Sequence, residues 1–230
     1  MRGEPDLTKS APKRQRNARG QGGRLTEDIV SGALSLIDRE GTDEAVTLRA
    51  VAREIGIAAP SIYAHFPDRS AIMLVVVARV FDELTQAILQ EALAAGNDPV
   101  EHLVGGCEGY VSFGLRCPAR YRVLFSERRP GDDEAWREYC KPVEIGPGGA
   151  PVFEVGAESF ALLVDSLAAC IAAGRSASTD AVADSTAIWV ALHGTVSLKR
   201  ATPGFPWPEP DDFVRRFVLR LARIQDDRPT

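Results

Sequence analysis

Residues 51–69 read VAREIGIAAPSIYAHFPDR, two short apolar segments separated by Gly56 and Pro60. The segment that ends at Gly56 carries apolar residues at helical spacing, and glycine readily adopts the left-handed backbone that closes many helices. A second helix has to begin near Pro60, because proline is tolerated only in the first turn. We therefore expect a helix, a four-residue turn and a second, very short helix.

This helix-turn-helix pattern is one that places a second helix in the major groove of DNA. Ile62 and Phe66 are expected to face inward, which leaves two polar rings, Tyr63 and His65, on the outside. Both side chains can donate hydrogen bonds to phosphate oxygens. Ordinary helical hairpins also carry exposed rings, so spacing alone leaves both interpretations open.

The charge of the chain is unevenly distributed. The 230 residues carry a formal net charge of −5, yet residues 1–24 contain seven Lys/Arg against two acids, which leaves −10 for the rest. A basic arm on an acidic body indicates a polyanion bound at one end. A disordered tail that only improves solubility would have the same composition, and charge does not separate the two.

Several classes of protein are excluded by pattern. No apolar run reaches the roughly 18 residues of a membrane span, and the N-terminus lacks the apolar region of a signal peptide, so we expect a soluble cytoplasmic protein. The four cysteines and three histidines have no metal-ligand spacing, which predicts no metal and no cofactor. Common catalytic motifs are absent as well, and we do not expect an enzyme.

Helical periodicity recurs along the chain and strand signals are few, which predicts an all-α fold of about nine helices. The first is expected to be capped by Thr26. The expected helices cover residues 26–40, 47–56, 60–66, 69–95, 99–115, 118–125, 152–173, 179–199 and 211–224. Residues 127–151 are predicted to form a surface loop around a short helical piece at 133–140. Four glycines in residues 99–115 indicate either close helix approach or space for a ligand.

The run TLRAVAREIGIAAPSIYAHFPDRSAIM, residues 47–73, closely resembles the N-terminal domain of TetR-type transcriptional regulators. The matching residues are Gly56, Ile57, Ser61, Ile62, Tyr63, His65, Phe66, Asp68 and Arg69. Ala58 departs from the family pattern, which has a Ser or Thr there that caps the recognition helix. The resemblance implies a basic flexible arm at 1–23, a helix-turn-helix DNA-binding domain at 24–70, and a helical ligand-binding and dimerisation domain at 71–230.

The resemblance also implies a homodimer that binds a pseudo-palindromic DNA operator, and a repressor that a small-molecule ligand releases. The expected phosphate contacts are Thr47, Tyr63, His65 and Arg69. The expected base contacts are Arg49, Ser61 and Ala64, with apolar contacts from Ala59 and Pro60. Arm residues Arg14, Arg16 and Arg19 are expected to enter the minor groove. The alternative is a helical ligand-binding or protein-interaction module that does not bind an operator.

In the C-terminal half, Trp189, His193 and Gly194 resemble the W-x-x-x-H-G element of one subclass of the family. There the last two helices form an intersubunit four-helix bundle, and we expect a dimer interface of Trp189, His193, Gly194, Phe213, Phe217 and Leu221. For His193, packing at that interface is preferred to ligand sensing. The expected ligand pocket comprises Val80, Phe81, Leu84, Cys107, Tyr110, Val111 and Phe113.

Overall fold

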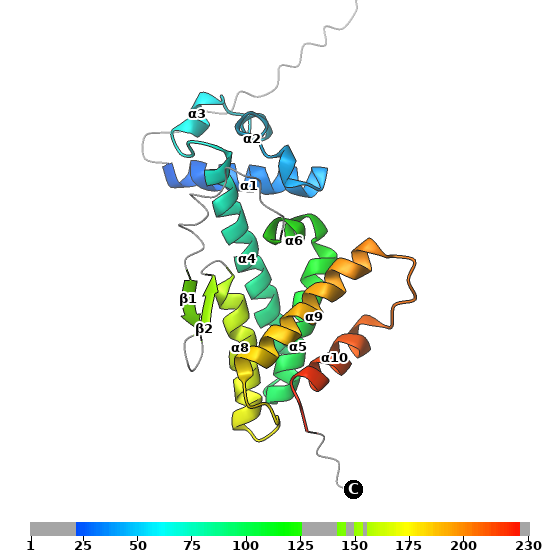
Figure 1. Cartoon of the computed structure of the whole chain (residues 1–230). Coiled ribbons are helices and arrows are strands. Elements are labelled where there is room, and N and C mark those ends of the chain that lie inside the picture. The colour runs from blue at the N-terminus through cyan, green and yellow to red at the C-terminus, as the bar shows by residue number, and fades with distance from the viewer. Residues whose placement is uncertain (1–21, 126–141, 146–149, 154–155, 226–230) are drawn as a thin grey trace, which may run out of the picture.

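The computed structural model describes residues 22–125, 142–145, 150–153 and 156–225 (Figure 1). Nine α-helices and one short 3-10 helix account for nearly all of the secondary structure in these ranges, as the all-α prediction required. The N-terminal helices lie at one end of the molecule, and the long helix α4 leads from them into a larger helical body. Of the arm expected at residues 1–23, residues 1–21 lie outside the described part, and the last two belong to the first helix.

The N-terminal domain consists of α1 (Gly22–Glu40), η1 (Asp43–Ala45), α2 (Leu48–Glu54) and α3 (Pro60–Tyr63). Thr47 caps α2, with its hydroxyl oxygen accepting a hydrogen bond from the Ala50 amide at 3.1 Å. Gly56 has a φ of +70°, and the amides of Gly56 and Ile57 donate to the carbonyls of Arg53 and Ala52. These two bonds form a Schellman motif, which ends α2 and turns the chain toward α3.

The body begins with α4 (Arg69–Ala94), α5 (Pro99–Arg116) and α6 (Pro118–Leu124). Asp68 and Asp98 cap the first two of these helices with their carboxylates, as their positions in the sequence suggest. Two glycines of α5 bring it close to α4: a Cβ on Gly105 would lie 2.7 Å from the Glu91 carbonyl oxygen, and one on Gly109 would lie 2.8 Å from that of Ala87. Close helix approach therefore explains these two glycines.

The rest of the body is formed by α8 (Ala157–Ala172), α9 (Ala181–Ala201) and α10 (Pro210–Leu221). Figure 1 shows α8 and α9 beside α4 and α5, with α10 along the outer side of α5 and α9. One continuous apolar core joins the two halves of the molecule. Among its fully buried side chains are Ile29, Ile37, Val51, Ile62, Ile72, Leu84, Leu103, Leu167 and Ile188.

Two local expectations were wrong. Residues 142–145 (β1, Pro142–Ile145) and 150–153 (β2, Ala150–Phe153) pair as antiparallel strands, so α8 begins at Ala157 and not at 152. Proline is accepted on the edge of a two-stranded ribbon but not inside a helix, and Pro151 lies in the segment predicted to lead into α8. The short helix expected at 133–140 lies outside the described residues.

The second wrong expectation concerns the start of α1. The helix begins at Gly22, so Thr26 lies within it and does not cap it. Its hydroxyl oxygen lies 3.1 Å from Nδ1 of His65, a contact between α1 and the end of α3. In the described part of the chain, no helix combines the length and apolarity that a membrane span requires.

Candidate functional site

The end of the molecule formed by α2 and α3 carries the residues predicted to contact DNA. Ile62 and Phe66 are buried and hold α3 against the domain core, as expected. On the opposite side, Tyr63 is 59% exposed. The other exposed members of the predicted set are Thr47, Arg49, Pro60, Ser61 and Ala64, whereas Ala59 is half-buried against the core. The fold thus gathers these residues, from two helices, on one accessible surface.

His65 differs from Tyr63 in its surroundings. It is half-buried, and its Nδ1 atom lies within hydrogen-bond distance of the Thr26 hydroxyl. This contact fixes the imidazole between α1 and α3, so that only Nε2 is left for an external partner. The phosphate contact of His65 stays a prediction that depends on that single nitrogen.

Arg69 is held by the protein itself. Its Nε atom donates to the Val46 carbonyl at 3.0 Å, and Nη2 donates both to the Asp43 carbonyl at 2.8 Å and to the Asp43 carboxylate at 2.7 Å. The guanidinium therefore ties the 3-10 helix to the first turn of α4. A DNA contact from Arg69 would have to use the remaining Nη1.

No side chain caps α3. Its N-cap residue is Ala59, and the structure shows no side-chain hydrogen bond at that end, as the Ala58 departure from the family pattern led us to expect. The backbone still closes the turn, since the Ser61 amide donates to the Ala58 carbonyl at 2.9 Å. The recognition helix is therefore positioned mainly by burial of Ile62 and Phe66.

A second candidate site is a cavity of about 360 Å³ inside the helical body, between α4, α5, α8 and α9. Its volume lies within the roughly 300–1,000 Å³ that is usual for small-molecule sites. Its described lining contains no Asp, Glu, Lys or Arg. The aromatic part of that lining is Phe81, Tyr110, Phe125, Phe160 and Trp189.

Four of the seven residues predicted for the pocket line this cavity: Phe81, Leu84, Cys107 and Tyr110. Val80, Val111 and Phe113 do not; they are buried elsewhere in the core. Adjacent helical residues point about 100° apart, so Val80 and Val111 face away from the side to which Phe81 and Tyr110 point. Gly106 also lines the cavity, which gives this glycine a different role from Gly105 and Gly109.

Trp189 was predicted only for the dimer interface, yet it lines the cavity. Its ring packs edge-on against that of Phe160, with the ring centroids 6.1 Å apart. Sequence reasoning also missed Phe160, Ser159 and His102, because an apolar stripe does not show which of its members border empty space. For Ser159 and His102 the signal was a polar residue inside an otherwise apolar helix face. Thr85 and Ser159 pair there through their hydroxyls at 2.7 Å.

His193 contacts its own subunit. The Tyr121 hydroxyl lies 2.8 Å from His193 Nδ1, and the Phe125 ring lies 4.5 Å from the imidazole, centroid to centroid. Burial lowers the pKa of His193 below its ordinary value. The side chain thus joins α9 to α6, whereas the sequence favoured packing against a second subunit.

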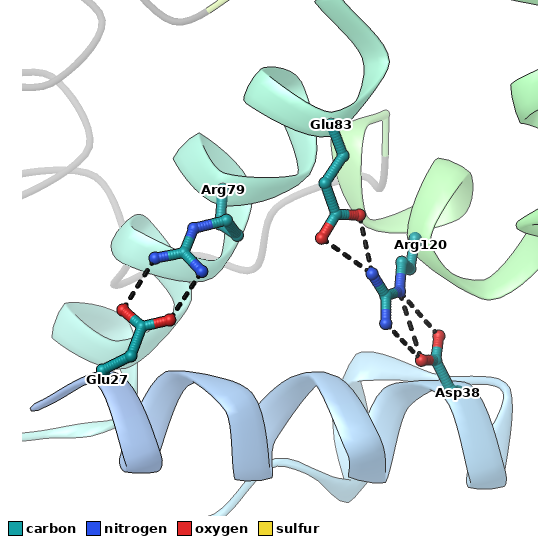
Figure 2. A network of polar contacts seen from close by, with 5 residues as sticks. All are labelled: Glu27, Asp38, Arg79, Glu83 and Arg120. Atoms are coloured by element: carbon teal, nitrogen blue, oxygen red, sulfur yellow. Dashed lines mark hydrogen bonds and ion pairs between the residues drawn. The ribbon is translucent and has the colours of Figure 1, made fainter. Parts of the chain in front are cut away.

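Ion pairs join α1 of the N-terminal domain to the helical body (Figure 2). Arg120 of α6 binds the Asp38 carboxylate of α1 at 2.6 Å and the Glu83 carboxylate of α4 at 2.7 Å, while Arg79 of α4 binds Glu27 of α1 at 2.7 Å. Helix α1 therefore has one ion pair to α4, through Glu27, and one to α6, through Asp38, and the same Arg120 of α6 also binds α4. A movement of α6 relative to α4 would therefore change the position of α1.

The surface of α9 and the segment after it is rich in exposed apolar side chains: Trp189, Val190, Leu198 and Phe205. A Cβ on Gly194 would meet no atom of the same subunit within 4 Å. In α10, the rings of Phe213 and Phe217 lie 5.5 Å apart, and these two residues and Leu221 are half-buried.

Comparisons with known proteins agree with this geometry. Residues 29–76 match a family model described as "Bacterial regulatory proteins, tetR family", and residues 103–221 match one described as "Tetracyclin repressor-like, C-terminal domain". An uncharacterized HTH-type transcriptional regulator from Mycobacterium tuberculosis is 29% identical over 204 residues, which cover 89% of this chain and 83% of that protein.

Solved structures share the fold. A protein of unknown function from Rhodococcus sp. RHA1 superposes with a TM-score of 0.69 at 22% identity, over 86% of this chain and 94% of its own. RolR in complex with resorcinol superposes with a TM-score of 0.58 at 14% identity, over 89% and 90% of the two chains. At these identities the likeness is one of fold.

Proposed function

Because the chain belongs to the TetR family of DNA-binding transcriptional regulators, we propose that it is a homodimeric repressor that a small molecule releases from a pseudo-palindromic operator. The observation that carries the proposal is the exposed surface of α2 and α3, with Arg49, Ser61 and Tyr63 on it, at the far end of a body that contains an apolar cavity. A regulator of this kind acts in the cytoplasm by binding, without catalysis or cofactor.

On DNA, α3 would enter the major groove. Tyr63 and Thr47 would donate their hydroxyl protons to phosphates on either side of it. The Thr47 oxygen already accepts from the Ala50 amide, which fixes its direction and leaves the hydroxyl proton available. Arg49 is exposed on α2 and has a long polar side chain suited to base edges, so base preference would depend on it more than on Ser61 or Ala64.

The dimer would form through α9 and α10. Exposed Val190 and Leu198 and the open surface at Gly194 offer an apolar face that a second copy of the chain could cover in a four-helix bundle. This arrangement corresponds to the W-x-x-x-H-G subclass. His193, which faces Tyr121, would lie behind that interface.

The two sites would communicate through α4 and α6. Ligand in the cavity touches Phe81 of α4 and Phe125 at the end of α6, and Arg120 carries any change in α6 to Asp38 of α1. Because the dimer fixes the two helical bodies, a tilt of α1 in each subunit would alter the separation of the two α3 helices. Operator affinity would fall as that separation departs from one helical turn of DNA.

The test is fluorescence polarisation with the full chain and labelled DNA from the region flanking its gene. We expect sequence-preferring binding whose affinity falls steeply as salt is raised, because Lys and Arg displace counterions from phosphates. Absence of any preferred sequence at low salt would contradict the proposal. It would favour a helical ligand-binding or interaction module, for which the uncapped α3 is the supporting feature.

A further inference from the structure

A chain of three polar side chains leads from the cavity to the outside of the helical body. The Tyr110 hydroxyl lies 2.9 Å from that of Tyr121, which in turn lies 2.8 Å from His193 Nδ1. Tyr110 lines the cavity, whereas Tyr121 and His193 line a second hollow between α6 and α9. The rings pack on one another, with Tyr110 edge-on to Tyr121 and Tyr121 stacked on His193.

The number of protons in this chain is fixed at neutral pH. Burial raises the pKa of Tyr110 to about 12 and raises that of Tyr121 further, so both hydroxyls keep their protons. Burial lowers the pKa of His193, so its imidazole carries a single proton, on Nδ1 or on Nε2. The position of that proton decides the direction of every hydrogen bond in the chain.

Two arrangements are possible. If Nδ1 is bare, Tyr121 donates to His193, Tyr110 donates to Tyr121, and Nε2–H faces the Ser197 hydroxyl at 3.4 Å. If Nδ1 carries the proton, all directions reverse: His193 donates to Tyr121, Tyr121 donates to Tyr110, and the Tyr110 proton is turned to the cavity.

The first arrangement is favoured before a ligand binds. In it every proton of the chain has an acceptor. The second turns the Tyr110 O–H toward the cavity, where its hydrogen-bonding neighbour among the described residues, besides Tyr121, is Trp189, whose indole N–H is itself a donor. A buried donor without an acceptor is unfavourable. The Tyr110 proton is therefore directed away from the cavity. Its oxygen already accepts from the Trp189 indole N–H, and the second lone pair of that oxygen is left for a ligand.

We propose that this oxygen accepts a hydrogen bond from a hydroxyl group of the ligand, so that the cavity selects neutral, largely aromatic molecules that carry a hydroxyl donor over those with an acceptor alone. The absence of charged side chains among the described lining residues disfavours ionised ligands, and the rings of Phe81, Phe160 and Trp189 suit an aromatic body. The inference rests on the proposed function only in taking this cavity as the effector site.

The test is isothermal titration calorimetry of the full chain with three naphthalenes of similar size. 2-Naphthol carries a hydroxyl donor, 2-methoxynaphthalene carries only an acceptor, and 2-ethylnaphthalene carries neither. We expect the wild type to prefer 2-naphthol. Tyr110→Phe should lower the ratio of 2-naphthol to 2-ethylnaphthalene affinity roughly five- to tenfold, the usual net effect of one hydrogen bond.

A second variant separates the direction of the chain from simple packing. Tyr121→Phe keeps the Tyr110 hydroxyl but removes the acceptor of its proton, which can then be donated into the cavity. We expect 2-methoxynaphthalene to gain affinity relative to 2-ethylnaphthalene, by a few-fold, whereas a loss of packing alone would weaken all three ligands together. Ser35→Ala, which removes an exposed hydroxyl from α1 outside the cavity lining, is the control and should leave all three affinities unchanged.

Three results would overturn the inference: no binding of any of the three to the wild type, a 2-naphthol preference that survives Tyr110→Phe, or equal weakening of all three in Tyr121→Phe. The calorimetry contains no DNA. Loss of operator binding with intact probe selectivity would therefore reject the proposed regulator and leave the ligand inference standing. The converse result would reject the inference alone.

Discussion

Arg120 Nη2 lies 2.6 Å from the Asp38 carboxylate, and the same guanidinium binds Glu83. One side chain of α6 thereby holds α1 and α4 together. The pairs are about one-quarter to one-half exposed, so their contribution to folding stability is modest, on the order of 1 kcal/mol. These ion pairs matter more for geometry than for stability, because they fix the position of α1 relative to the helices that line the cavity.

For Arg120→Gln we expect a small loss of thermal stability and a clear change in operator affinity, because α1 loses its fixed distance from α6. Polarisation titrations with operator DNA measure the second effect, and calorimetric melting measures the first. Arg216→Gln is the matched control, since Arg216 pairs with Asp212 within α10 on a highly exposed surface. Equal operator affinities in Arg120→Gln and the wild type would argue against coupling through α6.

Replacement of Gly56 by alanine should disturb the turn between α2 and α3. The residue has a φ of +70°, a conformation that costs a residue with a Cβ roughly 1–2 kcal/mol. We expect a lower melting temperature and weaker operator binding from Gly56→Ala. Gly23→Ala is the control, because a Cβ there meets no atom within 4 Å and its φ is not positive. A Gly56→Ala variant as stable as this control would show that the Schellman turn tolerates a side chain.

Gly194→Ala tests the dimer interface. Within one subunit the new Cβ meets nothing, so alanine in place of glycine inside α9 should stabilise the helix by about 0.5–1 kcal/mol. If a second subunit approaches closely at this point, the dimer should dissociate more readily, which sedimentation velocity over a range of concentrations would detect. A variant that is more stable than the wild type and dimerises equally well would show that the interface does not include Gly194.

The pH dependence of stability should contain a contribution from His193. Burial lowers its pKa in the folded state, so between that value and the ordinary value of about 6.5 the unfolded chain binds more protons than the folded one. Stability therefore rises with pH through this window and is lost as the pH falls below about 6.5. Urea titrations at several pH values between 5 and 8 should give a flatter profile for His193→Gln than for the wild type. Parallel profiles would mean that another group titrates there.

Local signals in the sequence predicted most of the fold. Gly56, Asp68 and Asp98 each act within one helical turn of their own position, and the elements they begin or end were located within a few residues. Packing between helices that are distant in the sequence was harder to predict. Whether Val80 or Phe81 borders the cavity depends on the rotation of α4 against its neighbours, which the apolar stripe does not determine.

The hydrogen-bonded chain of Tyr110, Tyr121 and His193 could not be predicted for the same reason. Tyr121 is 72 residues from His193 along the sequence, and nothing near either residue indicates that they meet. His193 was therefore assigned by analogy to the dimer contact. The residues predicted to contact DNA from α2 and α3 lie within about twenty positions of one another on two consecutive helices, so their exposure on one surface followed from local signals.

Arg49 and Tyr63 are expected to have different roles on DNA. Tyr63 is 59% exposed and ends in a hydroxyl suited to a phosphate, so Tyr63→Phe should weaken binding about equally on every sequence. Arg49 is also exposed, near the start of α2, and a guanidinium can pair with a guanine edge, so Arg49→Ala should cost about 1–3 kcal/mol on the preferred operator and relax the preference at one base pair. Selection of bound sequences from a randomised DNA pool, carried out with both variants and the wild type, measures the two effects side by side. A change of base preference in Tyr63→Phe together with a uniform loss in Arg49→Ala would reverse the assignment, making the tyrosine the reader of sequence and the arginine an anchor to the backbone.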